Sequence, residues 1–259
     1  MISVTSAQLY TWLAAFIWPL TRILGLITTA PLFGNVSVPA RVKIGLSILI
    51  GMMIAPAIPS GPALDPLSLS GLMILLQQMV IGMAMGFAMR IVFSAIEMAG
   101  EVTGLTMGLG FATFFDPQSQ GRSSAIAQFL SLLMLMIYLA ANFHLVLIST
   151  LVDSFNTMPI AATGLGSSGY HDIASWGGRI FSAGMQLSLP IVAALLINNI
   201  ALGILTRAAP QLNIFGIGFP VAIGVGFIMI AITIPYMATP IERLLQEGVD
   251  TIRQITTLR

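Results

Sequence analysis

The sequence predicts an all-α integral membrane protein with about six long hydrophobic helical segments. Of its 259 residues, 57% are apolar and only 7% are charged, whereas soluble domains carry roughly 25% charged residues. Several stretches have no charged side chain and are long enough to cross a hydrocarbon core, which takes about 20 helical residues. These stretches are residues 44–64, 66–89, 123–152, 180–206 and 208–241. A further apolar stretch, residues 7–33, is interrupted only by Arg22.

The first apolar stretch carries its basic residue in the middle. A signal peptide has a basic start and a small-residue cleavage site, so we expect residues 7–33 to remain as the first membrane segment. Arg22 could neutralise a carboxylate elsewhere in an assembly, but an arginine that snorkels from a tilted helix is the simpler interpretation. The segments leave no room for a soluble domain of about 50 residues or more. We therefore expect one membrane domain over residues 1–259.

Composition and missing motifs argue against several classes of function. The chain has no cysteine, which excludes disulfides, thiolate metal sites and cysteine nucleophiles. A net charge of +1 without a basic patch argues against nucleic-acid binding. The phosphate-binding loop, the HExxH zinc pair and the G-x-S-x-G nucleophile elbow are all absent from the sequence. We therefore expect a protein that is not an enzyme and has no cofactor, metal or nucleic-acid partner.

Residues 82–122 differ from an ordinary membrane helix in their glycines and charges. Glycines at four-residue spacing allow helices to approach closely, and those of this segment are Gly82, Gly86, Gly100, Gly104 and Gly108. Glu97 and Glu101 lie one helical turn apart, so they repel each other unless a cation or water relieves them. Carboxylates at membrane depth usually face a cavity or a partner. Arg90 lies on roughly the same face as Glu97, so an internal ion pair stays open as an alternative.

A loop is predicted directly after these glycines, because Asp116 before Pro117 and the later Gly121 are turn signals. The candidate gate residues of this loop are Gly110, Phe111, Thr113, Phe114, Phe115, Asp116 and Pro117. Its phenylalanines could simply pack in a core or at the membrane interface. The functional alternative is an apolar constriction that closes a water-filled pore by dewetting.

A second polar segment, residues 207–220, lies between two apolar stretches. Broken, polar backbone at this place needs a protein partner or water. The residues that give the segment its character are Arg207, Pro210, Gln211, Asn213, Phe215, Gly218 and Pro220.

The last residues, 241–259, are predicted to form an amphipathic tail. Apolar side chains recur there at three- and four-residue spacing, namely at Ile241, Leu244, Leu245, Val249, Ile252, Ile255 and Leu258. The charges of the tail sum to zero, whereas helices that bind anionic lipid are usually rich in lysine and arginine. We therefore expect the apolar face to dock on a protein partner rather than on a lipid surface.

The residues alone also leave open a secondary transporter. Its helices would be broken near a midplane site by prolines, for which the candidates are Pro19, Pro190, Pro220 and Pro235. Glu97 and Glu101 would form its ion pathway. The two halves of the chain share no convincing repeat, which argues against this class.

Two motifs resemble the FliR family, the flagellar members of the bacterial type III export-gate proteins. They are Gly-Phe-Ala-Thr-Phe-Phe-Asp-Pro at residues 110–117 and Ala-Pro-Gln-Leu-Asn-Ile-Phe-Gly-Ile-Gly-Phe-Pro at residues 209–220. The resemblance also covers length and segment layout across nearly the whole chain. The injectisome counterparts, the SctT family, share the Ala-Pro-Gln-Leu-Asn core, whereas Phe-Gly-Ile-Gly-Phe-Pro is more similar to the flagellar branch. One departure is that the family often has a basic residue shortly after Gly-Phe-Pro, where this chain has residues 221–224 without charge.

The resemblance implies a subunit that joins FliP and FliQ in a pseudo-helical, hetero-oligomeric export gate. That gate would lie in the bacterial inner membrane at the flagellar basal body, with membrane lipid around it and with FlhB and FlhA as neighbours. Its cargo would be unfolded flagellar proteins, and residues 110–117 would correspond to the plug of the export channel. Energy would come from outside this chain, so the resemblance implies no catalytic site and no cofactor.

Overall fold

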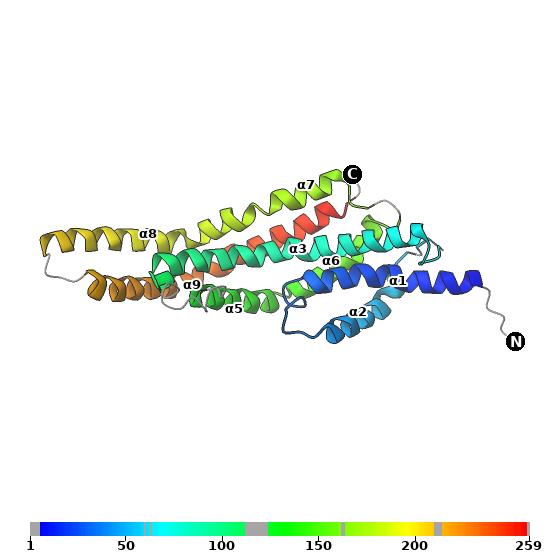
Figure 1. The fold of residues 1–259 in the computed structure, drawn as a ribbon, viewed down its shortest axis with the longest axis horizontal. Helices are drawn as coiled ribbons and strands as arrows, with labels where there is room; N and C mark the ends of the chain where they lie inside the picture. Colours follow the sequence, from blue (N-terminus) through cyan, green and yellow to red (C-terminus); the bar gives the residue numbers. More distant parts are fainter. Residues whose placement is uncertain are drawn as a thin grey trace. The chain divides into compact units, whose positions relative to one another are not determined.

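The computed structural model describes residues 6–59, 61–62, 64–111, 124–161, 164–209 and 214–257. Every regular element in this part of the chain is a helix, which confirms the all-α class (Figure 1). The α-helices are α1 (Ser6–Thr29), α2 (Ala40–Ile54), α3 (Leu69–Thr106), α5 (Ala125–Ala140), α6 (Phe143–Thr157), α7 (Ser167–Trp176), α8 (Arg179–Ala208) and α9 (Ile214–Ile255). Short 3-10 turns follow α2 and α3, namely η1 (Ala55–Ala57) and η2 (Leu109–Phe111).

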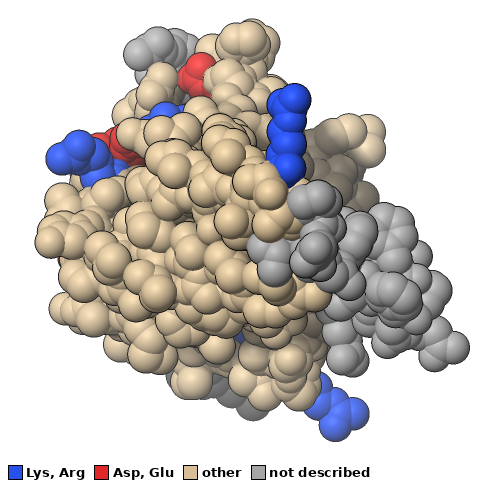
Figure 2. Space-filling model, turned by 90° about the vertical axis from the view of Figure 1, so that its left-hand side faces the viewer, with Lys and Arg blue, Asp and Glu red and all other residues tan. Residues whose placement is uncertain are grey.

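The long apolar helices suit a chain that crosses a membrane several times. Within the described residues, four helical spans are long and apolar enough to cross, or five if α5 and α6 together form one broken span. The four are Ala40–Ala57, Leu69–Thr106, Ser167–Ala208 and Gly216–Ile255. Figure 2 shows a face of the molecule on which charged side chains are few. The protein is therefore an integral, multi-pass membrane protein, and its apolar surface is what a lipid or subunit environment requires.

The predicted stretch 123–152 is interrupted between α5 and α6. Asn142 has a φ of 58°, a left-handed conformation that asparagine tolerates better than most residues. The N–H groups of Leu145 and Val146 bond to the carbonyl oxygen of Asn142, so α6 starts afresh from this residue. One hydrophobic run in the sequence thus gives two helices.

The contacts of the chain divide it into two compact units. The first unit contains Met1–Ile91, Asn142–Gly177 and Leu245–Arg259, and the second contains Val92–Ala141 and Gly178–Leu244. Helices α3 and α9 each contribute to both units. Each unit is therefore assembled from segments that are far apart in the sequence.

In the first unit, α1 and α3 approach each other at glycines. A Cβ atom on Gly25 of α1 would lie 2.5 Å from the carbonyl oxygen of Met79. A Cβ on Gly82 of α3 would overlap the carbonyl oxygen of Arg22, and one on Gly86 would overlap the hydroxyl of Thr29. The two backbones are thus nearly in contact, which side chains larger than hydrogen would prevent.

The tail is helical, as its periodicity predicts, but its apolar face is covered by the chain itself. The side chains on this face are buried within the structure, namely Ile241, Leu244, Leu245, Val249, Ile252 and Ile255. Gln246, Asp250 and Arg253 are exposed on the opposite side. The interpretation of this face as a docking surface for a partner is therefore wrong. Leu258 and Arg259 lie outside the described residues.

Candidate functional site

The start of α5 is held against the last turns of α3 by Glu101. Ser124 is the N-cap of α5, and its hydroxyl accepts the N–H of Ala127 at 3.2 Å. The N–H of Ser124 itself donates to the carboxylate Oε1 of Glu101 at 2.7 Å. A hydrogen bond to an ionised acceptor is stronger than a neutral one, and a negative charge is favourable at a helix N-terminus. Glu101 therefore stabilises the first turn of α5.

Two glycines of α3 create the space for this contact. A Cβ on Gly100 would overlap the backbone of Ala127, and a Cβ on Gly104 would lie 2.9 Å from the hydroxyl oxygen of Ser124. The first turn of α5 thus lies directly on the backbone of α3. Any larger residue at these two positions would push the capped end of α5 away from Glu101.

The end of α3 is fixed by a third glycine. Gly108 has a φ of +86°, a conformation that glycine adopts at no steric cost. A Cβ there would also lie 2.6 Å from the ring carbon Cε1 of Phe219 in α9. Met107, beside Gly108, is fully buried. The backbone therefore turns at Gly108 with the ring of Phe219 packed against it.

These contacts hold both flanks of the predicted gate loop on the same end of α3. Gly110 and the backbone of Phe111 lie in η2, directly after Gly108. The side chain of Phe111 lies outside the described part of the chain, as do the remaining predicted gate residues Thr113, Phe114, Phe115, Asp116 and Pro117. The loop leaves α3 beside Gly108 and enters α5 beside Glu101.

The predicted helix break within residues 207–220 lies between α8 and α9. Arg207 is exposed in the last turn of α8, and Gly218 and Pro220 belong to the first turns of α9. The backbone of Phe215 is also in α9, but its side chain lies outside the described residues. The signature residues Pro210, Gln211 and Asn213 fall outside the described residues entirely.

The two neighbouring glutamates of α3 have different surroundings. Glu101 is half-buried and bonded to Ser124, whereas Glu97 is exposed and its nearest polar contact is the hydroxyl of Ser131 at 3.5 Å. Arg90 is exposed, and neither it nor Glu97 has an ion-pair partner among the residues that the structure describes. The alternative of an internal ion pair between Arg90 and Glu97 is therefore wrong.

Arg22 lies at the centre of a buried polar cluster in the first unit. Its guanidinium is fully buried and donates from Nε to Gln78 Oε1 at 2.8 Å. Its Nη1 donates to the carbonyl and hydroxyl oxygens of Ser154 at 2.9 and 3.1 Å, and its Nη2 to the carbonyl oxygen of Met158 at 2.9 Å. The guanidinium carbon lies 4.3 Å from the centre of the Phe155 ring. The snorkelling interpretation is wrong, because Arg22 points into the protein.

No carboxylate bonds to Arg22 among the described residues, so its positive charge is compensated in another way. Ser154 and Met158 are at the C-terminal end of α6, where the carbonyl groups carry the negative end of the helix dipole. Arg22 supplies the donor that the carbonyl oxygen of Met158 lacks. The acceptors are 132 and 136 residues away in sequence, so local spacing gives no signal for them.

Comparison with known proteins decides the family. The sequence profile of the family described as bacterial export proteins, family 1, matches residues 13–248. The chain belongs to the FliR family of bacterial export proteins. A protein of Escherichia coli K12 named flagellar biosynthetic protein FliR is 44% identical over 255 residues, which are 98% of this chain and 97% of that protein. Its namesake in Pectobacterium carotovorum is 42% identical over 257 residues, 99% of this chain and 98% of that protein. The namesake in Bacillus subtilis is 28% identical over 247 residues, 94% of this chain and 95% of that protein.

The chemistry that this FliR-family chain offers at the loop is packing and hydrogen bonding. Within the described ranges, no three His, Cys, Asp or Glu side chains are grouped so that they could hold a metal ion. In the part of the chain that the structure describes, the half-buried carboxylate of Glu101 is engaged with backbone rather than with another ionisable group. The arrangement is suited to holding the two flanks of a loop, which is a mechanical task.

Proposed function

We propose that this chain is a subunit of the flagellar type III protein export gate in the bacterial inner membrane. The observation that carries the proposal is similarity over nearly the whole chain to proteins named flagellar biosynthetic protein FliR. This name favours the flagellar branch over the injectisome branch. The long apolar helices support a location within a membrane.

The proposed partners are FliP and FliQ, with which the chain forms the channel for unfolded flagellar subunits. FlhB and FlhA are the proposed neighbours at the flagellar basal body. Large apolar side chains are exposed along α8 and α9, for example Phe181 of α8 at 63% and Ile228 of α9 at 60%. Such surfaces need lipid or other subunits to cover them, which is what membership in a membrane assembly supplies.

Residues 110–117 are the proposed plug of the channel. A loop that blocks a pore has to be held at both of its ends, and the contacts at Gly108 and Glu101 provide such attachments. Apolar side chains in a narrow passage exclude water and so stop ions as well. No covalent step is needed, and the energy for export comes from other components.

The plug is tested by replacing residues 111–115 with a Gly-Ser sequence of equal length, which keeps both attachments. The chain is co-expressed with FliP and FliQ, and entry of a small solute into the cells is measured. We expect the variant to make the membrane leaky, because the apolar side chains that exclude water are gone. The matched control replaces residues 118–120, the polar part of the same loop, and is expected to stay tight.

Assembly is measured in parallel by native mass spectrometry of the purified complex. An assembled complex with unchanged permeability would refute the plug while leaving the gate intact. A chain that never associates with small multi-pass partners would refute the export gate itself. A lone chain that transports a solute in liposomes would instead favour a transporter built on Glu97 and Glu101.

A further inference from the structure

A pocket in the first unit is lined by polar residue types in a chain that is mostly apolar. The pocket has a volume of about 400 Å³ and lies between the end of α6 and the end of α9. Every residue of its lining is polar, namely Thr150, Asp153, Ser154, Asn156, Thr157, Arg253, Thr256 and Thr257. The two charges are one carboxylate and one guanidinium. Ser154 also belongs to the Arg22 cluster, whereas the other seven lining residues belong neither to that cluster nor to the proposed plug.

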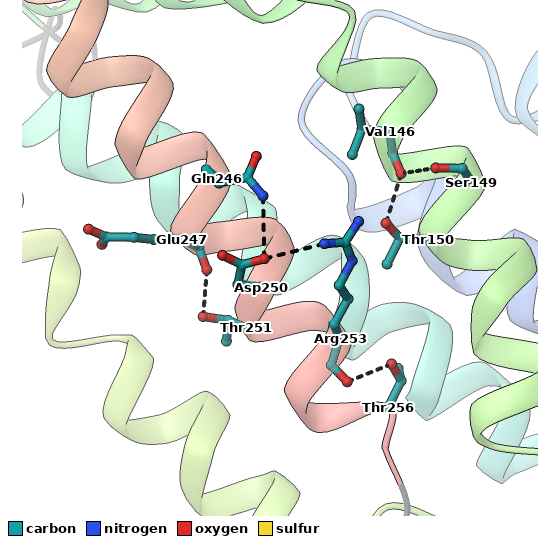
Figure 3. Close-up of polar contacts among 9 residues, drawn as sticks. All are labelled: Val146, Ser149, Thr150, Gln246, Glu247, Asp250, Thr251, Arg253 and Thr256. Carbon is teal, nitrogen blue, oxygen red and sulfur yellow. Dashed lines mark hydrogen bonds and ion pairs between the residues drawn. The ribbon is translucent and has the colours of Figure 1, made fainter.

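The hydroxyl protons of the pocket are already used, and of its hydroxyl-bearing residues only Thr157 and Thr257 are exposed. Thr150 donates to the carbonyl oxygen of Val146 at 2.8 Å, and Thr256 donates to that of Ile252 at 2.9 Å, with a second contact to Arg253. Figure 3 shows these two threonines bonded to their own helices. The hydroxyls of Ser154, Thr157 and Thr257 are likewise bonded to backbone carbonyls. A hydroxyl whose proton is used in this way has only oxygen lone pairs left to present.

These lone pairs and a free carboxylate favour a cation with several N–H groups. Asp153 is exposed, and its carboxylate has no hydrogen bond or ion pair among the described residues. The pocket also lies at the C-terminal ends of α6 and α9, where helix dipoles favour positive charge. A primary ammonium group has three donors for such acceptors, whereas a quaternary ammonium has none.

Arg253 adds a place for an anion beside the cation. Its only ion pair in the described residues is a 3.4 Å contact with Asp250, and both side chains are more than half exposed. Exposed pairs of this kind are worth about 0–1 kcal/mol, so a ligand can compete for the guanidinium. A phosphate is the natural partner for an arginine with unused donors. The pocket therefore matches a zwitterion with a primary ammonium and a phosphate.

An apolar stripe on α6 leads to the mouth of this pocket. Leu145 is 55% exposed, and Ile148 and Val152 are half-buried. Spacings of three and four residues place them on one face of the helix together with Asn156, which lines the pocket. A ligand with acyl chains would lie along this stripe with its polar end in the pocket.

We infer that this pocket binds the head group of phosphatidylethanolamine. The ammonium is held by Asp153 and by the hydroxyl oxygens of Thr157 and Thr257. The phosphate is held by Arg253, and the acyl chains run along the apolar stripe of α6. An anionic lipid offers a phosphate to Arg253 but no ammonium group to the carboxylate of Asp153. A choline lipid has no N–H to donate. The inference is independent of the proposed plug.

The test uses the full chain in nanodiscs that contain equal parts of dioleoyl phosphatidylethanolamine, phosphatidylcholine and phosphatidylglycerol. After release into detergent, native mass spectrometry counts the lipid of each class that stays bound. We expect phosphatidylethanolamine to be retained about tenfold over the other two, because one charge-assisted hydrogen bond is worth that factor. Equal retention of the three classes, or preference for the anionic or the choline lipid, would overturn the inference.

Variants then assign the binding to the pocket. Asp153→Asn and Arg253→Gln are each expected to lower retention of phosphatidylethanolamine about tenfold, by loss of one charged contact. Glu242→Gln is the matched control, because it removes one exposed charge of α9 outside the pocket. Retention that survives Asp153→Asn unchanged would place the lipid elsewhere and refute the pocket. The comparison of lipid classes on the unmodified chain stands even if a variant fails to fold.

Discussion

Replacement of Arg22 by methionine should strongly destabilise the first unit. The substitution keeps a long side chain but removes every donor, so Gln78 Oε1 and the carbonyl oxygen of Met158 lose their bonds. The carbonyl oxygen of Ser154 still accepts the N–H of Met158 at 2.9 Å and stays satisfied. Two stranded buried acceptors cost about 1–3 kcal/mol each. Removal of the buried charge offsets part of this, so we expect a net loss of about 3 kcal/mol.

The assay is thermal unfolding of the purified chain in detergent, followed by tryptophan fluorescence. Trp18 is fully buried one helical turn before Arg22 and reports on this region. For a chain of this length, a loss of about 3 kcal/mol in the free energy of unfolding lowers the melting temperature by about 6–12 °C. Arg90→Met is the control, because Arg90 is exposed, and it should change the melting temperature little.

A double variant separates the stranded acceptor from the lost charge. Adding Gln78→Leu to Arg22→Met removes the amide that the first change leaves without its donor. Replacing both members of a buried polar pair by apolar groups is often nearly neutral. The double variant should therefore be more stable than Arg22→Met alone. The reasoning fails if Arg22→Met melts like the unmodified chain, or if Gln78→Leu makes it worse.

Three further substitutions are expected to change the melting temperature in the same assay. Gly82→Ala should lower the free energy of unfolding by about 1–3 kcal/mol, because the added Cβ meets the backbone of α1. Gly203→Ala is the control, since its Cβ has open space and the change should be neutral or stabilising. Equal effects of the two changes would contradict the close packing. Glu101→Gln should lower the free energy of unfolding by about 1 kcal/mol, because the negative charge at the start of α5 is lost. Glu97→Gln is the control and should change the free energy of unfolding very little. The reverse order of the two effects would contradict the capping role of Glu101. Gly108→Ala should lower the free energy of unfolding by at least about 1 kcal/mol, because φ is positive at this residue. An unchanged melting temperature would mean that the backbone can leave this conformation without loss of stability.

The fold class could be predicted because it depends on composition and on charge-free length, which are local properties. The helical tail could be predicted for the same reason, since periodicity reports which residues share a face. Periodicity does not report what covers that face, so the burial of Ile241 and Val249 within the chain was missed. The break at Asn142 was missed as well. A single long helix and two helices joined at one left-handed residue have the same apolar composition, so composition does not distinguish them.

Contacts at the candidate site join residues that are near or far apart in the sequence, and only those that follow from local spacing could be predicted. Four-residue glycine spacing predicts close helix packing, and the structure places backbone against Gly82 and Gly100. The spacing could not say which helix each glycine faces. The bond from Ser124 to Glu101 joins residues 23 apart, and those of Arg22 reach up to 136 residues. Such pairings depend on how helices meet in space, which a single sequence does not encode locally.

Arg22 and Glu101 follow one physical rule despite their opposite charges. Neither bonds to an ionised partner among the described residues, and each bonds to a backbone group that a helix end leaves open. Arg22 meets carbonyl oxygens at the end of α6, and Glu101 meets an N–H at the start of α5, so each sign matches the helix dipole at its position. In an apolar surrounding no water can satisfy these groups, and a charged side chain is the strongest available substitute. These two charges are thus used where helices end, and Glu101 lies at the edge of the proposed plug.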